Sequence, residues 1–286
     1  MRGPSPAFAA PALLMLGASV FVPLLAVAAF SLTDYRLGYR DLAPVGADNY
    51  ASVLADPGVL RAVANSALYF LLVTPLSVLG GLAAAIAAEG AGRWRPWLRA
   101  ALFVPYVSLL VAMGVVWELI LHPSIGPVNG LLAALGLSPQ AFLADPDQAL
   151  WVLCAIGVWQ QLGFNMVLFS AALQAVPSDL LEAAALDGVP PGWERAARIM
   201  VPLLGRTAAF ALLATAVHAL QVFDLVAVLT RGGPAGATEV MLYAIWREGF
   251  SYFDIGRAAA MTVVLLGPLA LLCIAYWRLV RRAGAV

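Results

Sequence analysis

Long apolar stretches alternate with short polar segments along the whole chain. Six of the stretches are long enough for a helix that crosses a bilayer, which needs about 20 residues. They cover approximately residues 9–31, 63–88, 98–121, 149–175, 206–230 and 258–280. The pattern therefore predicts an all-α, polytopic membrane protein with about six transmembrane helices, which together form a single transmembrane domain over residues 1–286.

The polar segment at 177–205 combines charge with helical patterning. Its charged residues are Asp179, Glu182, Asp187, Glu194, Arg195 and Arg198. Residues 178–187 predict a short helix with Ser178 as its N-cap, Gly188 allows a turn, and a second helix begins near Trp193. We therefore predict a helix–turn–helix loop in water between helices four and five. Such a loop either docks on an aqueous partner or is simply a solvated connection.

The composition agrees with membrane insertion and argues against several classes of protein. Apolar residues make up 63% of the chain and charged residues 11%, whereas a soluble domain has about 25% charged residues. The net charge is zero, which gives no sign of nucleic-acid binding. All 16 basic residues are arginine, so the lysine of a Walker-type ATP-binding loop is missing. Any ATP hydrolysis would therefore occur on another chain, and this chain is predicted not to be an enzyme.

Metal and cofactor sites are not predicted. The two cysteines, Cys154 and Cys273, lie within apolar stretches and are predicted to be small buried hydrophobic residues. The two histidines, His122 and His218, are far apart in the sequence, so with the two buried cysteines they form no plausible metal cluster. We expect no catalytic residues, no metal and no cofactor.

The arginines are unevenly divided between the two sides of the predicted membrane. If the N-terminus is cytoplasmic, ten arginines are cytoplasmic: Arg2, Arg93, Arg95, Arg99, Arg195, Arg198, Arg206, Arg278, Arg281 and Arg282. Six belong to the outer loops 32–62, 122–148 and 231–257: Arg36, Arg40, Arg61, Arg231, Arg247 and Arg257. Positive residues concentrate in cytoplasmic loops, so both termini and loop 177–205 are predicted to be cytoplasmic. The first apolar run is too long for a signal peptide and is predicted to be a retained helix.

Loop 177–205 resembles the EAA loop of permease subunits of bacterial ABC importers. The matching residues are Glu182, Ala183, Ala184, Asp187, Gly188, Ile199 and Pro202. Other matching segments are Asp48-Asn49-Tyr50, Phe103-Val104-Pro105-Tyr106 and Thr230-Arg231-Gly232-Gly233-Pro234. They are similar to one branch, the carbohydrate-importer permeases such as the larger maltose permease subunit and the glycerol-3-phosphate permease.

The resemblance implies a subunit of a larger complex in the bacterial inner membrane. The implied partners are a second, similar permease chain, a dimer of cytoplasmic ATPase subunits, an extracytoplasmic substrate-binding protein and membrane lipid. The first helix of the loop would insert into a cleft on the ATPase. Glu182 would pair with a cation there, and Gly188 would set the angle of this lever.

The second half of the loop departs from the family pattern. Ile199 lies eleven residues after Gly188 instead of about ten, which indicates a one-residue insertion at Pro190-Pro191-Gly192. Ala196-Ala197 stand where the family usually has a bulky aromatic residue. Turns absorb insertions more easily than helices do. We therefore predict that Glu182–Gly188 has the structure usual in the family, and that the ATPase contacts of the following residues differ from it.

Candidate residues for the translocation path lie in helices four and five: Gln160, Gln161, Phe164, Asn165, Thr215, His218 and Gln221. Polar groups in membrane helices usually face a cavity or the bundle interior, and hydrogen bonds between helices are an equally good explanation. Amides, hydroxyls and aromatic faces suit a sugar, whereas a phosphate calls for a cation, and no arginine lies in mid-helix. We therefore predict a neutral sugar or oligosaccharide, with glycerol-3-phosphate or another polyol as the alternative.

Two other classes of function compete with the importer. A self-sufficient secondary transporter often has inverted repeats and acidic residues inside the membrane, and the sequence has no clear repeat and no carboxylate in mid-membrane. An intramembrane enzyme needs a metal cluster or a nucleophile–base pair, and the sequence provides no plausible one.

Overall fold

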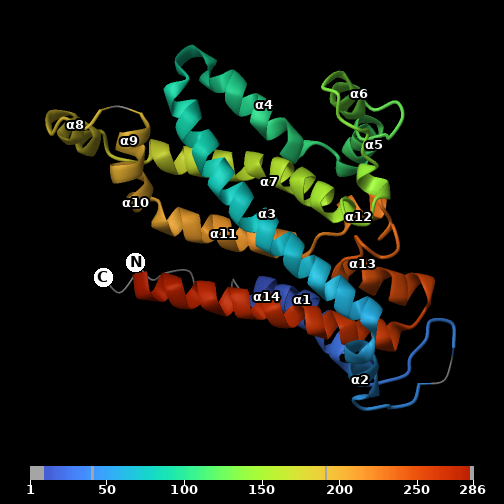
Figure 1. The fold of residues 1–286 in the computed structure, drawn as a ribbon. Helices are drawn as coiled ribbons and strands as arrows, with labels where there is room; N and C mark the ends of the chain where they lie inside the picture. Colours follow the sequence, from blue (N-terminus) through green and yellow to red (C-terminus); the bar gives the residue numbers. More distant parts are fainter. Residues whose placement is uncertain (1–9, 40–41, 191, 284–286) are drawn as a thin grey trace. The chain divides into compact units, whose positions relative to one another are not determined.

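The computed structural model describes residues 10–39, 42–190 and 192–283, and this part of the chain is built from helices (Figure 1). Its only β-type pairings are two isolated bridges, Thr33 with Pro44 and Arg36 with Asp254. The all-α prediction is therefore confirmed. Arg2, Arg40 and Pro191, which entered the sequence predictions, lie outside the described residues.

In the part of the chain that the structure describes, five helical segments are long and apolar enough to cross a membrane. They are α1 (Ala10–Phe30), α3 (Pro57–Gly90), α7 (Ala149–Gln174), α14 (Ile255–Ala283), and α11 (Gly205–Leu220) continued by α12 (Asp224–Leu229). Each corresponds to one predicted span. Pro23, Pro75 and Pro268 lie inside α1, α3 and α14 without ending them.

The remaining predicted span, 98–121, is not one continuous helix. It consists of α4 (Arg95–Val107) and α5 (Leu110–Ile120), and the segment is bent by 100° between them. Ser108 and Leu109 leave the helical conformation, with ψ angles of 142° and 118°. Pro105 lies inside α4, which continues to Val107, so the bend comes after the turn that the missing N–H of Pro105 affects. The structure therefore divides this predicted span into two helices.

The shorter helices lie in the segments that join the spans. They are α2 (Asp48–Ala55), α6 (Pro127–Ala134), α8 (Ser178–Leu186), α9 (Trp193–Arg195), α10 (Val201–Leu203) and α13 (Met241–Trp246). Among the described residues, π-helical turns occur at Ala196–Met200 and Arg247–Ser251, and 3₁₀ turns at Gly92–Trp94 and Phe142–Ala144.

Residue contacts divide the chain into two compact units, and the single-domain prediction stays a prediction. The larger unit contains residues 61–240 and 269–286. Within it α4 packs along α7, and α5 packs against α12. Close approach depends on glycine: a Cβ on Gly81 would collide with Asn165, and a Cβ on Gly163 would collide with the Leu102 carbonyl. Gly81 therefore allows α3 to pack closely against α7.

The smaller unit contains residues 1–60 and 241–268. Asn49 Nδ2 donates to the carbonyls of Ser31 (2.9 Å) and Thr33 (2.8 Å), which fixes the segment after α1 against α2. Gly256 donates its N–H to the Tyr35 carbonyl at 2.9 Å. A Cβ on Gly256 would collide with the Thr33 carbonyl, so only glycine fits at this start of α14.

The cysteine prediction is half right. Cys154 is buried on α7, as predicted, but Cys273 is exposed on α14. Its neighbours Leu271 and Ile274 are also exposed. The error arises because an apolar stretch in a membrane helix includes a face that the chain itself does not cover.

Candidate functional site

Loop 177–205 begins with α8, whose first turn differs from the prediction. The N-cap position is Pro177, and Ser178 is the first helical residue, so Ser178 is not the N-cap. The Ser178 hydroxyl lies 3.3 Å from Asp179 Oδ1 instead of bonding a free backbone N–H. Pro177 suits this place because its fixed φ, here −59°, lets the chain enter the helix without strain.

The EAA residues present one exposed surface. Glu182, Ala183, Asp187 and Gly188 are exposed, whereas Ala184 is buried. Glu182 makes no hydrogen bond or ion pair with any described residue. Gly188 has a φ of +78°, the left-handed conformation that favours glycine, and it ends the helix as predicted. Leu186 is 90% exposed, so the tip of the loop offers both charge and apolar area.

The second half of the loop returns through an irregular helix. It starts at Trp193, as predicted, and passes through the π-helical turn Ala196–Met200. Each π-type bond spans one residue more than an α-type bond. Part of the extra length relative to the family can therefore lie in this helix, and Pro191 in the turn is outside the described residues. Ile199 is half-buried and Pro202 exposed.

Asn165 and Thr215 join α7 to α11. Both are fully buried. The Thr215 hydroxyl donates to Asn165 Oδ1 at 3.2 Å, and Asn165 Nδ2 donates to the Gln161 carbonyl at 3.1 Å. The polar groups of this pair are thus bonded within the chain, which is the arrangement expected of a helix-packing contact.

The remaining candidates on α7 are Gln160, Gln161 and Phe164, and aromatic pairs join this helix to α4 and α5. Gln161 is buried, and its Oε1 has no hydrogen-bond partner among the described residues. Gln160 and Phe164 are half-buried. The Phe164 ring lies 5.2 Å from that of Tyr106, and Trp159 meets Trp117 edge-to-face at 5.3 Å. Sequence reasoning did not place Tyr106 and Trp117 at this site, because the bend between α4 and α5 brings them to α7.

The polar candidates on α11, which are Thr215, His218 and Gln221, do not lie on one face of the helix. Thr215 points into the packing, whereas His218 and Gln221 are exposed on the chain. Gln221 is the C-cap of α11, so it lies at a helix break instead of in mid-helix. Residues spaced three apart shift gradually around a helix that has about 3.6 residues per turn, and the sequence-based prediction did not take this shift into account.

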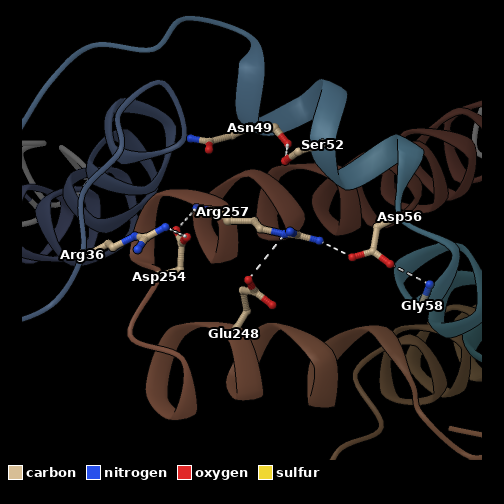
Figure 2. Close-up of polar contacts among 8 residues, drawn as sticks. All are labelled: Arg36, Asn49, Ser52, Asp56, Gly58, Glu248, Asp254 and Arg257. Carbon is tan, nitrogen blue, oxygen red and sulfur yellow. Dashed lines mark hydrogen bonds and ion pairs between the residues drawn. The ribbon is translucent and has the colours of Figure 1, made fainter.

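The smaller unit contains an ionic cluster that sequence reasoning missed: Arg36, Asp56, Glu248, Asp254 and Arg257 (Figure 2). Arg257 pairs with Asp56, and its Nε lies 3.4 Å from Glu248 Oε1. Arg36 lies 3.6 Å from Asp254, which also accepts the Arg257 N–H at 3.0 Å. The members come from segments more than 200 residues apart, so no local pattern could indicate the cluster.

The cluster shifts the pKa of two carboxyl groups in opposite directions. Partial burial raises the pKa of Asp56, but the Gly58 N–H and the Arg257 guanidinium outweigh it, so the net pKa lies below the usual range. Burial raises the pKa of Glu248, and the nearby Arg257 only partly offsets this. Among the described residues, no group of three or more His, Cys, Asp or Glu side chains could hold a metal ion.

Two groups of polar side chains in the connecting segments hold the backbone in place. The amide of Asn129 exchanges hydrogen bonds with the Gln140 backbone, at 2.8 and 2.9 Å, and fixes the segment between them. In the TRGGP segment, the Thr238 hydroxyl lies 2.7 Å from the Thr230 hydroxyl and 2.6 Å from the Gly233 carbonyl. Arg61 and Asn65 of α3 donate to the carbonyls of Ala235 and Glu239.

Comparison with known proteins gives one consistent family. The family described as "Binding-protein-dependent transport system inner membrane component" matches residues 77–284. The sn-glycerol-3-phosphate transport system permease protein UgpA of Agrobacterium fabrum is 32% identical over 223 residues, which is 78% of this chain and 75% of that protein. The osmoprotective compounds uptake permease protein GgtC of Synechocystis is 33% identical over 265 residues, 91% of this chain and 92% of that protein.

The fold also matches a solved structure. One chain of a bacterial alginate ABC transporter, in complex with an alginate pentasaccharide-bound periplasmic protein, superposes with a TM-score of 0.85. The match covers 97% of this chain and 93% of that chain, at 20% sequence identity.

Proposed function

The chain belongs to the family of binding-protein-dependent transport system inner membrane components, and from this membership we propose that it forms one half of the translocation path of an ATP-driven importer for a neutral sugar or oligosaccharide. A second, similar permease chain forms the other half. An ATPase dimer binds on the cytoplasmic side, and an extracytoplasmic binding protein delivers the substrate. The termini and loop 177–205 are cytoplasmic, as the arginine distribution favours.

The observation that carries the proposal is the exposed EAA surface of loop 177–205. Glu182 is charged, exposed and unpaired among the described residues, and Gly188 ends α8 with a positive φ. A separate ATPase can supply the missing partner for Glu182. The absence of lysine from the sequence supports hydrolysis on that other subunit. Asp187 and the half-buried Ile199 complete the contact, with Ala183, Ala184 and Pro202 shaping it.

The test of the coupling role compares two charge reversals on α8. Glu182→Lys removes the group proposed to pair with the ATPase, and Asp179→Lys makes the same change one turn earlier. We expect Glu182→Lys to reduce ATP-driven uptake about tenfold, the effect of losing about 1.4 kcal/mol of coupling, and Asp179→Lys to have a much smaller effect. Equal uptake by Glu182→Lys and the parent transporter would contradict the role.

For the substrate, the proposal rests on the chemistry of the exposed and half-buried groups on α7 and α11, together with the buried amide of Gln161, whose Oε1 has no partner among the described residues. Gln160, Gln161, His218 and Gln221 offer amide and imidazole groups, and Phe164 offers an aromatic face. No arginine lies in the middle of these helices. A neutral polyhydroxyl ligand matches this set, whereas a phosphate lacks a charged partner. Asn165 and Thr215 act behind the path, where they hold the two helices together.

A glycerol-3-phosphate importer is the second candidate, because UgpA proteins are named for that substrate and are 32% identical to this chain. Uptake by the assembled transporter separates the two. Neutral sugars and glycerol-3-phosphate are tested separately as substrates and as competitors, together with calorimetric binding to the cognate binding protein. Uptake of glycerol-3-phosphate with no neutral sugar accepted by the binding protein would replace the first candidate with the second.

A further inference from the structure

A cavity of about 450 Å³ lies between loop 177–205 and the ends of α3 and α7 that adjoin it. Its walls are largely apolar and include Ile86, Leu173, Leu181, Trp193 and Met200. These ends are the last turns of two membrane spans, so the cavity is at the depth where the hydrocarbon of one leaflet meets its headgroups. It belongs to neither the EAA surface nor the proposed path.

The charged groups at this cavity carry an excess of positive charge. Glu89 and Arg195 line it directly. Glu89 Oε1 also accepts from both Arg95 and Arg99, at 2.6 Å each. Glu89 therefore pairs with two guanidinium groups, and Arg195 adds a third at the cavity, so these four groups carry a net charge of +2. The Nε atoms of Arg95, Arg99 and Arg195 are buried and have no hydrogen-bond acceptor among the described residues. An anionic ligand could supply that acceptor.

The segment that carries two of these arginines has the character of a membrane interface. Trp94 and Trp97 are exposed, and the Arg93 guanidinium lies 5.4 Å from the centre of the Trp94 ring. Tryptophan and arginine gather where the bilayer meets water. Basic residues at this level attract anionic lipid headgroups.

We propose that this cavity binds an anionic phospholipid of the adjoining leaflet. The phosphate lies against the Arg95, Arg99 and Arg195 guanidinium groups, and an acyl chain enters the space between Ile86, Leu173 and Met200. The apolar walls favour a lipid over a soluble anion, because a free phosphate would leave this area uncovered. The cationic rim favours an anionic headgroup over a zwitterionic one. The leaflet is the cytoplasmic one, which rests on the orientation in the proposed function.

Trp193 lines the cavity and can report on its occupant. The assembled transporter is placed in nanodiscs of phosphatidylcholine that contain about 10 mol% of brominated phosphatidylglycerol or brominated phosphatidylcholine. The signal of Trp193 is the difference between the parent protein and Trp193→Phe. We expect the anionic lipid to quench this signal at least about twice as strongly as the zwitterionic lipid. Arg99→Gln should raise the phosphatidylglycerol content needed for half-maximal quenching about fivefold, the expected effect of one basic residue near a membrane surface.

A second pair of variants tests the cavity without changing a charge. Ala87→Phe fills the cavity from an exposed position that lines it, and Ala83→Phe adds the same ring one turn earlier, outside the lining. Only Ala87→Phe should abolish the preference for the anionic lipid. Arg195→Gln is less suitable, because Arg195 Nη2 also bonds the Val189 carbonyl at 3.0 Å.

Three results would overturn the proposal. They are equal quenching by both brominated lipids, loss of the preference when millimolar inorganic phosphate is added, and a preference that exists only after the ATPase is removed. The second points to a soluble anion and the third to an ATPase segment in the cavity. Uptake is measured separately in vesicles, so normal uptake with no lipid preference rejects the lipid site and leaves the proposed function intact.

Discussion

Loop 177–205 and the ionic cluster around Arg257 are both rich in charged side chains, but they differ in whether those side chains are paired within the chain. In the loop, Glu182 and Asp187 are exposed, and Glu182 has no partner in the described part of the chain. In the cluster, Arg257 pairs with Asp56 and Glu248, which come from distant parts of the sequence (Figure 2). Charges that the chain pairs internally support its fold, whereas charges left free are available to a partner. The two regions should therefore respond differently to substitution.

The largest expected effect is on coupling, from Gly188→Leu. Gly188 has a φ of +78° in open space, so a side chain strains the backbone and would also enter the proposed ATPase cleft. Gly136 has a φ of +73°, also in open space, but lies outside the loop. Gly136→Leu carries the same backbone strain, about 1–2 kcal/mol. We expect uptake to fall more than tenfold in Gly188→Leu only. Equal losses in both variants would reduce the role of Gly188 to stability.

The next effect is on stability, from Arg257→Gln. This change removes the partner of Asp56 and leaves Glu248 half-buried beside Asp254. Arg257 is 24% exposed and Arg36 62%, so Arg36→Gln is the matched exposed control. We expect Arg257→Gln to cost about 2 kcal/mol and to lower Tm by about 4–8 °C, against at most about 1 kcal/mol for Arg36→Gln. Thermal unfolding in detergent measures both. Uptake at low temperature should be nearly normal, in contrast to Gly188→Leu.

Helices α7 and α11 contain polar residues that are paired within the chain and polar residues that are exposed, so the same contrast can be tested on them. Thr215 is paired with Asn165 inside the chain, and His218 is exposed. Thr215→Val keeps the shape and should cost about 0.6 kcal/mol, the average of a hydrogen bond between membrane helices, with substrate affinity unchanged. His218→Ala should weaken uptake affinity with little change in Tm. If His218→Ala left affinity intact, His218 would belong with the packing residues.

The sequence carries enough information for the spans and the EAA loop because these depend on local patterns. Apolar runs of sufficient length located five helices, and Gly188 ended α8 where its conformational freedom suggested. The bend at Ser108-Leu109 could not be located from the sequence, because these two residues lie within the apolar stretch and Pro105 lies inside α4, before the bend. The Arg257 cluster and the Trp117–Trp159 contact were missed for another reason, since each depends on tertiary structure that brings distant segments together. The roles of individual path residues still depend on the partner chains.

The smallest effect concerns the pH dependence of Asp56→Asn, and its sign follows from the pKa. Partial burial raises the pKa of Asp56, but the Gly58 N–H and Arg257 lower it more, to a net value below the usual one near 3.8. The ionised carboxylate therefore stabilises the fold at pH values above about 4, and this contribution is lost as the pH falls through the folded-state pKa. The difference in Tm between the parent and Asp56→Asn should be a few degrees at most at pH 7, as for an exposed pair, and should shrink below pH 4.

Glu248 acts in the opposite direction, because burial raises its pKa and acidification relieves that cost. The comparison is therefore made in a Glu248→Gln background. A Tm difference that stayed constant from pH 7 to pH 3 would mean that Asp56 contributes through the hydrogen bond that it accepts from the Gly58 N–H, and not through its charge.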